Sequence, residues 1–569
     1  MDCAEFKREF HKRVNDFLTS EGKSCKRICN NRVPYGTAGF RGPSEHIKHL
    51  FFKVGIVSGL RCMHLEYARF SGLMITASHN PIGDNGVKLV EGNGEMLDPS
   101  WEGIVEDFCN LSSSDEIDES FNRTLGSILE HWTLDVVSRH KVVIIGHDTR
   151  PSCKELVALA IEGLRTLEPY VRFVDYGEVT TPILHYLVAE SNKKQLEGPI
   201  LKDMIVNVYD GYFQQLSSGL DEIFRDFKTC INYDPHLLVV DCANGVGYNA
   251  IKRLIQDPAV IEHLHIEPVN IGDGVLNHLS GADYVKTKGL PPTNCGHLGK
   301  RYASLDGDAD RIIYFYLTAS DDGDTNQLRL IDGDKIMTLY AIHLKNMIMQ
   351  AGLDSQLTLG VVQTAYANGS STEYLRDNLK LKVDTVDTGV KNLHKKALEY
   401  DIAIYFEANG HGTIWISDKA RELINESSCA SARHLKKLLQ ILINYTGDAI
   451  SNILIVETIL RHLDWSTSDW YNIYKDRPNS LIKVQVDDKD LIKTTNAGRT
   501  CSSPAVLQES IDKLVGSCGP GARCFVRPSG TENVVRIYSE ANDQQVANQL
   551  AIGVGEVVKR ICSTLVSQT

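Results

Sequence analysis

Three stretches of this 569-residue chain share one pattern: an apolar run, a polar loop that contains glycine, and a helical segment. The apolar runs cover residues 141–145, 237–240 and 359–362, and each is typical of a short buried strand. Strand, loop and helix in this order indicate a βαβ unit with its loop at the carboxyl end of the strand. The units recur at a spacing of roughly a hundred residues, so the sequence predicts three α/β domains of similar topology.

The C-terminal part differs from this pattern. Residues 481–486 alternate apolar and polar side chains, as in a half-buried strand, and further strands are predicted at 523–526 and 534–538. Together with the helical patterns between and after them, these strands predict a small α+β domain that follows a polar linker at 470–479. The predicted domains are residues 1–195, 196–318, 319–469 and 470–569.

Charge and composition narrow the function classes. The formal net charge of −13 argues against a nucleic-acid-binding protein, because few phosphates could be neutralised. The 14 cysteines are scattered without a C-x-x-C pair, which favours reduced thiols over a zinc site or a disulfide framework. No apolar stretch approaches the ~20 residues that span a bilayer, and residues 1–13 lack an apolar signal core. We therefore expect a soluble, cytoplasmic protein with no membrane and no nucleic-acid partner.

The sequence TASHNP at residues 76–81 places a hydroxyl and an imidazole, Ser78 and His79, directly after the apolar run 72–75. Strand ends of α/β domains often carry catalytic groups, because the sheet holds the loop rigidly. Ser78 could therefore be a nucleophile, or it could be a turn residue before the Asn-Pro step. This stretch by itself leaves both interpretations open.

A metal-binding pattern is present at Asp306, Asp308 and Asp310, which alternate along an extended segment and so share one side of it. Carboxylates this close repel one another unless a cation binds, and oxygen ligands favour Mg²⁺ or Ca²⁺. The alternative is a solvated acidic turn, which is the interpretation that we prefer for residues 321–324. Because an apolar strand follows at 312–316, we predict a metal site at the triplet.

Residues 404–412, IYFEANGHG, again lead from a buried strand into a polar loop. Glu407, Asn409 and His411 supply a carboxylate, an amide and an imidazole, a set that can bind vicinal sugar hydroxyls. Glu407 could instead be a structural cap, and His411 could be a loop histidine with partners of its own.

Two arginine-containing loops are candidates for binding phosphate. Residues 526–532, VRPSGTE, combine a guanidinium with hydroxyls and the amides of a glycine turn, and a guanidinium can hold a phosphate with two hydrogen bonds. The glycines of YGTAGFRG at 35–42 would let the backbone approach an anion closely. The alternatives are a hairpin turn and a plain glycine turn. The candidates in the first loop and the strand after it are Arg527, Ser529, Gly530, Thr531 and Arg536.

The combination of these loops predicts phosphoryl transfer on a sugar phosphate. A metal and flanking cations would stabilise the transferring group, and a sugar-binding loop would position the acceptor. Because a serine hydroxyl is a poor nucleophile, a nearby acid or base must manage its proton. The alternatives are a sugar-phosphate-binding protein, which would need no nucleophile, and a metal-dependent phosphatase, which would release free phosphate.

The motifs TASHNP, DGDADR, EANGH and RPSGTE, in this order, resemble the α-D-phosphohexomutase superfamily from residue 36 to the C-terminal domain. Other members typically carry Ser where this chain has Asn409, and in this respect it resembles the branch that acts on N-acetylglucosamine phosphates. Segments 94–101 and 363–371 show the same resemblance. A related mutase acting on glucose or mannose phosphates is the alternative that Asn409 disfavours.

The resemblance implies three α/β domains with mixed sheets and a flexible fourth, α+β domain around a central cleft. It implies that Ser78 is carried as phosphoserine, and that one Mg²⁺ is held by Ser78, Asp306, Asp308 and Asp310. N-acetylglucosamine 6-phosphate would become the 1-phosphate through a 1,6-bisphosphate, for UDP-N-acetylglucosamine biosynthesis. N-acetylglucosamine 1,6-bisphosphate or glucose 1,6-bisphosphate would be the activator. The only partner implied is a small sugar phosphate, and the chain would be a monomer or weak homo-oligomer.

The resemblance also implies roles for the candidate residues. Those near the transferring phosphoryl would be Arg41, His79, Lys88 and Arg311, with Lys88 and Arg41 as the acid and base. Glu407, Asn409 and His411 would hold sugar hydroxyls, and the candidates at 527–536 would hold the other phosphate. His147, Asn392 and Asn533 depart from the family pattern without removing any of these groups.

Overall fold

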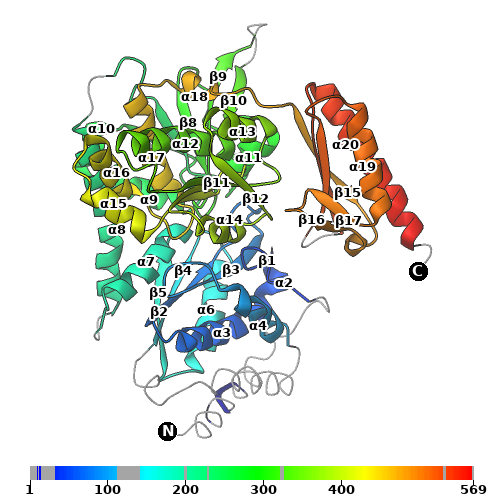
Figure 1. Ribbon diagram of the computed structural model, residues 1–569. Helices are drawn as coiled ribbons and strands as arrows, with labels where there is room; N and C mark the ends of the chain where they lie inside the picture. Colours follow the sequence, from blue (N-terminus) through cyan, green and yellow to red (C-terminus); the bar gives the residue numbers. More distant parts are fainter. Residues whose placement is uncertain are drawn as a thin grey trace. The chain divides into compact units, whose positions relative to one another are not determined.

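The computed structural model describes residue 9 and residues 12–14, 32–111, 141–197, 201–226, 230–320, 326–529 and 533–566 (Figure 1). The acidic residues 321–324 and the predicted phosphate-binding residues Gly530 and Thr531 lie outside this part. The chain divides into two compact units. The first comprises residues 1–229, 234–330 and 437–458, and the second comprises residues 230–233, 331–436 and 459–569.

The first sheet belongs to the first unit and has the strand order β1-β3-β2-β4-β5. Strands β2, β4 and β5 are parallel, whereas β3 is antiparallel to both of its neighbours. Every residue of β2 is buried, because Leu73 and Ile75 join the hydrophobic core with α3 and α6 while Gly72 packs on Val188 of α7. The bounds are β1 Phe40–Pro43, β2 Phe70–Ile75, β3 Asp84–Val90, β4 Lys141–His147, β5 Val171–Glu178, α3 Phe51–His64, α6 Cys153–Arg165 and α7 Thr181–Lys193.

The second sheet also belongs to the first unit and has the order β10-β9-β8-β6-β7. Strands β7, β6 and β8 are parallel, and β9 returns antiparallel to β8. The bounds are β6 Leu238–Asp241, β7 Ile266–Val269, β8 Arg301–Leu305, β9 Ile312–Ala319, β10 Asn326–Ile331, α9 Gly247–Leu254 and α11 Ala282–Lys288. Because β10 is part of this sheet, the second sheet continues beyond residue 318.

The third sheet lies in the second unit and has the order β12-β11-β13-β14. Strands β12, β11 and β13 are parallel, and β14 is antiparallel to β13. The bounds are β11 Leu359–Thr364, β12 Lys382–Val386, β13 Ile402–Phe406, β14 Gly412–Ile416, α12 Gly333–Gln350 and α14 Val390–Ala397.

The three mixed sheets share one spatial arrangement, which confirms the predicted α/β class and the similar topology. In each sheet an antiparallel strand pairs with the outer strand of a parallel trio, so the hairpins β2–β3, β8–β9 and β13–β14 occupy equivalent places. The chain order differs, because β2–β3 precedes β4 and β5, whereas β8–β9 and β13–β14 end their trios. The loops of these hairpins contain Ser78, the aspartate triplet and Glu407.

The C-terminal part of the second unit forms the predicted α+β structure. Its antiparallel sheet has the order β15-β19-β18, and α19 and α20 complete its hydrophobic core. The bounds are β15 Asn479–Gln485, β16 Lys493–Thr495, β17 Thr500–Ser503, β18 Arg523–Pro528, β19 Val534–Glu540, α19 Ala505–Ser517 and α20 Gln544–Val566.

The linker predicted at 470–479 begins later than expected. Trp470 is fully buried in α18 (Thr467–Tyr471), and its indole N–H donates to the carbonyl of Lys335 at 3.0 Å. An indole is amphipathic, and here both its apolar body and its donor are satisfied inside the fold. The connection to the C-terminal sheet therefore starts after Tyr471.

Of the remaining helices, α17 (Ala449–Leu463) reaches the candidate site, because the amide of its first residue, Ala449, donates to the carbonyl of Ala309 at 3.2 Å. The bounds of the remaining helices are α2 Ser44–Ile47, η1 Lys48–Leu50, α4 Pro99–Cys109, α8 Leu201–Phe224, α10 Pro258–His263, α13 Gly369–Glu373, η3 Tyr374–Asn378, α15 Asp418–Glu426, α16 Ala430–Ile441, α17 Ala449–Leu463 and η4 Lys489–Leu491. Among the described residues, no helix combines the length and apolarity that crossing a bilayer would require.

Candidate active site

Ser78 lies three residues beyond the end of β2, with its backbone in the left-handed region at φ 52° and only 1% of its surface exposed. Its Oγ donates to Oδ2 of Asp306 at 2.6 Å and lies 3.4 Å from Nδ1 of His79. A non-glycine residue in this conformation costs free energy and persists only where its surroundings hold it. The loop around Ser78 must therefore be fixed by its contacts.

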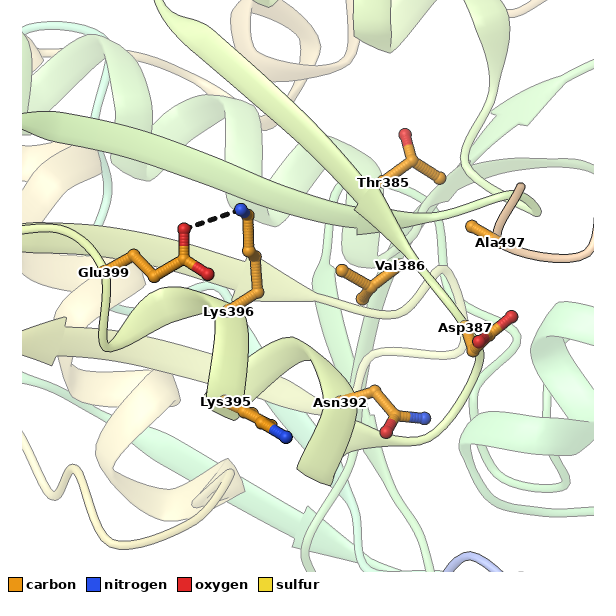
Figure 2. A pocket seen from close by; sticks show the side chains of 8 residues that line it. All are labelled: Thr385, Val386, Asp387, Asn392, Lys395, Lys396, Glu399 and Ala497. Carbon is orange, nitrogen blue, oxygen red and sulfur yellow. Dashed lines mark hydrogen bonds and ion pairs between the residues drawn. The ribbon is translucent and has the colours of Figure 1, made fainter. Parts of the chain in front are cut away.

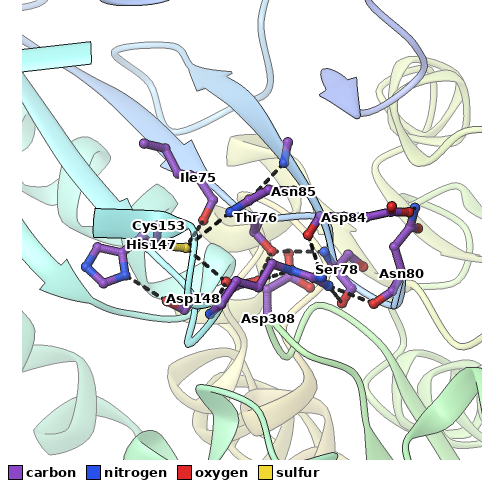
Figure 3. A network of polar contacts seen from close by, with 12 residues as sticks. Ile75, Thr76, Ser78, Asn80, Asp84, Asn85, His147, Asp148, Cys153 and Asp308 are labelled. Atoms are coloured by element: carbon purple, nitrogen blue, oxygen red, sulfur yellow. Dashed lines mark hydrogen bonds and ion pairs between the residues drawn. The ribbon is translucent and has the colours of Figure 1, made fainter. Parts of the chain in front are cut away.

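Part of that restraint comes from the end of β4 (Figure 3). The Ser78 amide donates to Oγ1 of Thr76 at 2.9 Å, and the Thr76 hydroxyl donates to Oδ2 of Asp148 at 2.7 Å. Asp148 also binds Nε of Arg150 at 2.9 Å, and both side chains are fully enclosed. The Arg150 guanidinium donates to the carbonyls of Ser78, Asn80, Pro81 and Asp84 at 2.5–3.0 Å.

Sequence reasoning missed this restraint. The segment GHDTRP at 146–151 follows a predicted strand and contains an Asp two residues before an Arg. This spacing was the sequence signal from which an ion pair at the strand end could have been predicted. His147, the departure within it, uses Nδ1 to donate to the carbonyl of Asp148 at 2.7 Å. It thus stabilises the turn that presents Asp148 and Arg150.

The predicted aspartate triplet comes together in the loop between β8 and β9. Asp306, Asp308 and Asp310 are buried, and one carboxylate oxygen from each lies within 4.8 Å of the others. Oδ1 of Asp306 accepts from the backbone amides of Asp310 and Arg311 at 3.1 Å each, which curls the loop around the carboxylates. The Thr181 hydroxyl, at the start of α7, donates to Oδ2 of Asp308 at 2.6 Å.

Cationic side chains face this cluster. Nζ of Lys88, on β3, lies 2.9 Å from Oδ2 of both Asp308 and Asp310. Burial opposes its charge, but the two carboxylates outweigh burial and raise the pKa of Lys88 above its ordinary value. Nε of Arg311 lies 3.7 Å from Oδ2 of Asp306. Lys88 is therefore protonated and partly neutralises the triplet.

Arg41 reaches the same cluster from the edge strand β1. Burial and the neighbouring Arg311 lower the pKa of Arg41, and the three aspartates oppose that shift. The glycines near it serve close packing: a Cβ on Gly39, at φ 91°, would lie 2.0 Å from the carbonyl of Val87. Gly39 is therefore explained by close packing of the loop, as in a plain glycine turn. Arg41, in contrast, belongs to the candidate site.

His79 is neutral near pH 7 in this environment. Burial is the main cause that lowers its pKa, and the nearby Arg311 and Arg41 lower it further. At this position His79 therefore adds no positive charge to the cluster. A neutral imidazole can still exchange a hydrogen bond with the Ser78 hydroxyl or with an oxygen bound to it.

The triplet fits a hard divalent cation. Burial and the charges of Asp310 and Asp308 raise the pKa of Asp306 far above its ordinary value, as expected for crowded carboxylates. Oδ1 of Asp308 is buried and accepts no hydrogen bond from the described residues. An all-oxygen donor set with an unsatisfied buried oxygen suits Mg²⁺ better than a soft metal.

In the second unit, the predicted sugar-binding residues also lie in one loop, between β13 and β14. Oε1 of Glu407 accepts from the amide of Gly389 at 3.0 Å, and Oε2 accepts from the Asn409 amide group at 3.2 Å. Oδ1 of Asn409 in turn accepts from the backbone amide of His411 at 3.0 Å. The loop is therefore pre-organised, with donor and acceptor groups on three neighbouring side chains.

Beside this loop, α14 and β12 border a pocket of ≈ 340 Å³ (Figure 2). Asn392, the second departure from the family pattern, lines it, and its Nδ2 donates to the carbonyl of Thr388 at 3.1 Å. The lining residues are Thr385, Val386, Asp387, Asn392, Lys395, Lys396, Glu399 and Ala497. The substitution at 392 thus changes the wall of a pocket and leaves Gly389 and Glu407 in place.

The predicted phosphate-binding arginines lie opposite each other on the β18–β19 hairpin, where Arg527 pairs with Arg536 across the strands. Directly opposed like charges destabilise a hairpin unless an anion is present. Nε of Arg536 is buried and has no hydrogen-bond partner in the described part of the chain. Ser529 is 7% exposed, and its amide donates to the carbonyl of Val534 at 2.8 Å. Asn533, the third departure, donates from Nδ2 to the carbonyl of Asp487 at 3.2 Å.

The chain is similar to known proteins over most of its length. Family models match residues 332–465 (phosphoacetylglucosamine mutase AMG1, domain III), 481–554 (phosphoglucomutase/phosphomannomutase, C-terminal domain) and 44–116 with 110–198 (the alpha/beta/alpha domain I of the same group). The phosphoacetylglucosamine mutases of Sus scrofa and Homo sapiens are each 42% identical to it. The alignments cover 95% and 91% of this chain and 97% and 92% of those proteins.

Solved structures show the same similarity. An N-acetylglucosamine-phosphate mutase in its substrate complex superposes with a TM-score of 0.85 at 38% identity, covering 96% of this chain and 100% of that one. The Aspergillus fumigatus N-acetylphosphoglucosamine mutase, solved with GlcNAc-6P and magnesium, gives a TM-score of 0.84 at 35% identity, covering 98% of this chain and 99% of that one. A structure from the same fungus contains glucose 1,6-bisphosphate and superposes with a TM-score of 0.85.

Proposed function

This chain belongs to the phosphoacetylglucosamine mutase family of the α-D-phosphohexomutases, and on that premise we propose that it interconverts N-acetylglucosamine 6-phosphate and N-acetylglucosamine 1-phosphate. The observation that carries the proposal is the Ser78 hydroxyl, 2.6 Å from Asp306 in a cluster of buried carboxylates and cations. A binding protein would not need a buried nucleophile beside a candidate metal site.

In the proposed reaction Ser78 is carried as a phosphoester. A sugar hydroxyl oxygen bonds to phosphorus while the bond from phosphorus to Oγ of Ser78 breaks, which gives the 1,6-bisphosphate. The hydroxyl loses one proton and Oγ gains one, so charge and atoms balance. In the second half the other phosphoryl of the turned intermediate returns to Oγ, and the product leaves.

Lys88 and Arg41 are the proposed acid and base. Because its pKa is raised, Lys88 is protonated and so carries the proton that the leaving Oγ would need. The lowered pKa of Arg41 suits it better than an exposed arginine to accepting one. Arg311 and neutral His79 would contact the phosphoryl oxygens, and pre-organised cations of this kind stabilise charge during transfer.

We propose that one Mg²⁺ binds Asp306, Asp308, Asp310 and an oxygen on phosphorylated Ser78. When bound, it would act as a Lewis acid toward the phosphoryl group. The orphaned Oδ1 of Asp308 supports this assignment, as does the magnesium in the Aspergillus fumigatus relative. Glucose 1,6-bisphosphate, present in another structure from that fungus, is the proposed activator, with N-acetylglucosamine 1,6-bisphosphate as the natural intermediate.

The second unit would supply the rest of the substrate contacts. We propose that Glu407, Asn409 and His411 bind sugar hydroxyls, because they form one polar loop. Arg527, Ser529 and Arg536, together with Gly530 and Thr531, would bind the phosphate that is not transferred. The opposed pair Arg527 and Arg536 supports this, since an anion would relieve its repulsion.

We also propose four domains. The boundary expected at 195–196 is kept, and the boundary expected at 469–470 is moved to the end of α18 at Tyr471. The boundary expected at 318–319 is better placed at residue 331, because β10 belongs to the second sheet. The division of the chain between Leu330 and Ile331 supports this placement. We further propose a cytoplasmic enzyme of UDP-N-acetylglucosamine biosynthesis that is a monomer or weak homo-oligomer. The described cysteines are all free thiols, as a reducing compartment allows.

The test is incubation of the full chain with N-acetylglucosamine 6-phosphate, Mg²⁺ and a catalytic amount of glucose 1,6-bisphosphate, followed by phosphorus NMR. We expect an anomeric phosphate signal to grow at the expense of the 6-phosphate. Folded protein that produces no such signal would overturn the proposal. Release of inorganic phosphate would indicate a phosphatase, and faster conversion of glucose 1-phosphate would indicate a hexose mutase.

A further inference from the structure

A residue from the second sheet reaches the Ser78 loop of the first. Asn277 lies between β7 and α11, in the left-handed region at φ 56°, and its backbone amide donates to the carbonyl of Ala243 at 3.0 Å. Its side-chain Nδ2 donates to the carbonyl of Ser78 at 2.8 Å and to the carbonyl of Asn80 at 3.0 Å. Both distances are those of good hydrogen bonds.

The same two carbonyls accept from Arg150, whose Nη2 lies 3.0 Å from the Ser78 oxygen and 2.9 Å from the Asn80 oxygen. Arg150 follows β4 of the first sheet, and Asn277 follows β7 of the second. The Ser78 loop is therefore held by two side chains, one from a loop of each sheet. Gly307, in the aspartate loop, packs directly against the Ser78 carbonyl. A Cβ at this position would lie 2.6 Å from the Ser78 oxygen and 3.1 Å from Nδ2 of Asn277. The carbonyl of Ser78 therefore has a single orientation.

That orientation fixes the reactive hydroxyl. A carbonyl held in place restricts the peptide plane after Ser78, while the Thr76 hydroxyl restrains the amide before it. With both planes held, Ser78 stays in its unfavourable φ 52° conformation and Oγ stays 2.6 Å from Asp306. Without the Asn277 amide, the loop could relax toward an ordinary backbone conformation and move Oγ.

We propose that Asn277 is a positioning residue for phosphoryl transfer, because its side-chain amide ties the Ser78 loop to the sheet that carries the aspartate triplet. This inference rests on the proposed function, since it requires Ser78 to be the phosphoryl carrier. Both hydrogen bonds of the Asn277 side chain to the loop go to backbone carbonyls, so Asn277 would act through the orientation of Ser78 and not on the substrate.

The experiment compares three forms of the full chain in the mutase assay. Asn277→Asp keeps the size of the side chain and its tolerance of the left-handed region, but an ionised carboxylate cannot donate to two carbonyls. Asn277→Gly keeps the backbone conformation and removes the amide. We expect kcat to fall roughly 30- to 100-fold for N277D and about 10-fold for N277G, because small misplacements of a reacting atom are costly. KM should stay within about threefold of the wild type, because substrate contacts are unchanged.

A second readout separates positioning from general structural damage. Each protein is phosphorylated with glucose 1,6-bisphosphate, freed of ligand, and then challenged with N-acetylglucosamine 6-phosphate. We expect the variants to transfer a smaller fraction of the phosphoryl group to sugar and a larger fraction to water than the wild type does. Asn496→Asp, at an exposed asparagine with φ 54°, is the matched control and should behave like the wild type.

The outcomes are distinguishable. An inactive wild type would overturn the proposed function. An active wild type with N277G equal to it in kcat and in phosphoryl partition would overturn the positioning role alone. A uniform loss of thermal stability with unchanged partition between sugar and water would also overturn it, because that pattern indicates a structural residue.

Discussion

Ser78 shows how one residue can combine strain with reactivity. Its left-handed backbone is unfavourable for a residue with a Cβ, yet the loop is held by Thr76, Arg150 and Asn277. Strained backbone of this kind concentrates at functional sites, where surrounding contacts over-determine the conformation. Here those contacts point the hydroxyl at Asp306. The free energy stored in the loop is therefore balanced by contacts that also orient the reactive group.

Replacing Ser78 with alanine should abolish turnover and leave the fold intact. The variant keeps a Cβ, so the backbone strain is unchanged, but it loses the oxygen that would carry the phosphoryl group. We expect kcat to fall by about 10³-fold or more in the mutase assay. Thermal unfolding should remain within a few degrees of the wild type.

Ser218→Ala is a suitable control, because Ser218 is an exposed serine of α8 whose hydroxyl donates to the helix carbonyls of Gln214 at 2.7 Å and Gln215 at 3.3 Å. It should retain full activity. If Ser78→Ala kept more than about 1% of the wild-type rate, another residue would have to be the phosphoryl carrier.

The aspartate triplet should give the metal-free protein an unusual dependence on pH. The folded-state pKa of Asp306 is raised above the ordinary value of 3.8 by burial and by Asp310 and Asp308. The folded state therefore holds a proton that the unfolded chain releases, so stability from this group is present below pH 3.8 and is lost as pH rises toward the folded pKa.

In EDTA, Asp306→Asn should remove that loss. We expect the free energy of unfolding, measured by urea titration at several pH values, to decline less steeply above pH 4 in the variant than in the wild type. Excess Mg²⁺ should stabilise the wild type selectively, because a cation favours the ionised carboxylates. Equal pH profiles for the two proteins in EDTA would contradict the raised pKa.

At the scale of elements, the recurring unit is the hairpin at the edge of each parallel trio. The β2–β3 loop carries the Ser78 hydroxyl, and the β8–β9 loop carries the three carboxylates. The β13–β14 loop carries the predicted sugar-binding residues. In each case the sheet holds both ends of a short loop by backbone hydrogen bonds, so side chains of the loop are positioned more rigidly than in a longer connection. The same scaffold thus presents three different chemistries.

Close packing behind such a loop should matter as much as its side chains. A Cβ on Gly333, at the start of α12, would lie 2.0 Å from the carbonyl of Glu407. Gly333→Ala should therefore push the β13–β14 loop away from α12. We expect KM for N-acetylglucosamine 6-phosphate to rise about tenfold, while phosphorylation of Ser78 by glucose 1,6-bisphosphate still occurs.

Gly516→Ala is the matched control. Gly516 lies in α19, and a Cβ there would meet nothing within 4 Å. Because alanine favours a helix, this variant should be unchanged or slightly stabilised, by about 0.5–1 kcal/mol. A normal KM for Gly333→Ala would show that the loop is not positioned by α12.

The sequence predicted the strands and the candidate site better than it predicted how they are connected. Apolar runs and the aspartate spacing are local signals, and β2, β9 and the triplet were found where expected. The pattern drew attention to the loops after β4, β6 and β11, whereas the candidate groups lie after β2, β8 and β13. Arg150 and Asn277 were missed because their role depends on contacts between loops 66 or more residues apart, which no local pattern encodes.

At the scale of the whole molecule, the resemblance implies a flexible C-terminal domain, and contacts within the second unit show where its sheet is attached. Glu540, at the end of β19, is fully buried and binds Arg523 at 2.7 and 2.8 Å. It also accepts from the Gly369 amide at 3.0 Å, and Arg523 donates to the carbonyl of Ala365 at 3.1 Å. Residues that follow β11 are thereby joined to the base of the β18–β19 hairpin.

The attachment and the predicted phosphate site lie at opposite ends of the same hairpin. Arg523 pairs with Glu540 at its base, and Arg527 pairs with Arg536 four residues further along. We therefore expect any movement of the phosphate-binding end relative to the third sheet to pivot about the buried base. This arrangement allows the arginines to move while the hairpin stays attached.

Removing the charge of Glu540 should loosen that base. In Glu540→Gln the Arg523 guanidinium loses its charged partner, and breaking a buried ion pair costs about 3 kcal/mol. We expect the C-terminal sheet to unfold at lower urea than the rest of the chain, with faster amide exchange at Gly369 and along β19. KM for sugar phosphates should rise as the arginines lose their support.

Glu373→Gln, which breaks the exposed ion pair with Arg477, is the control. Its free energy of unfolding should fall by less than about 1 kcal/mol. Equal behaviour of the two variants would mean that the C-terminal sheet is held by its apolar contacts with Tyr366, and that the buried pair is dispensable.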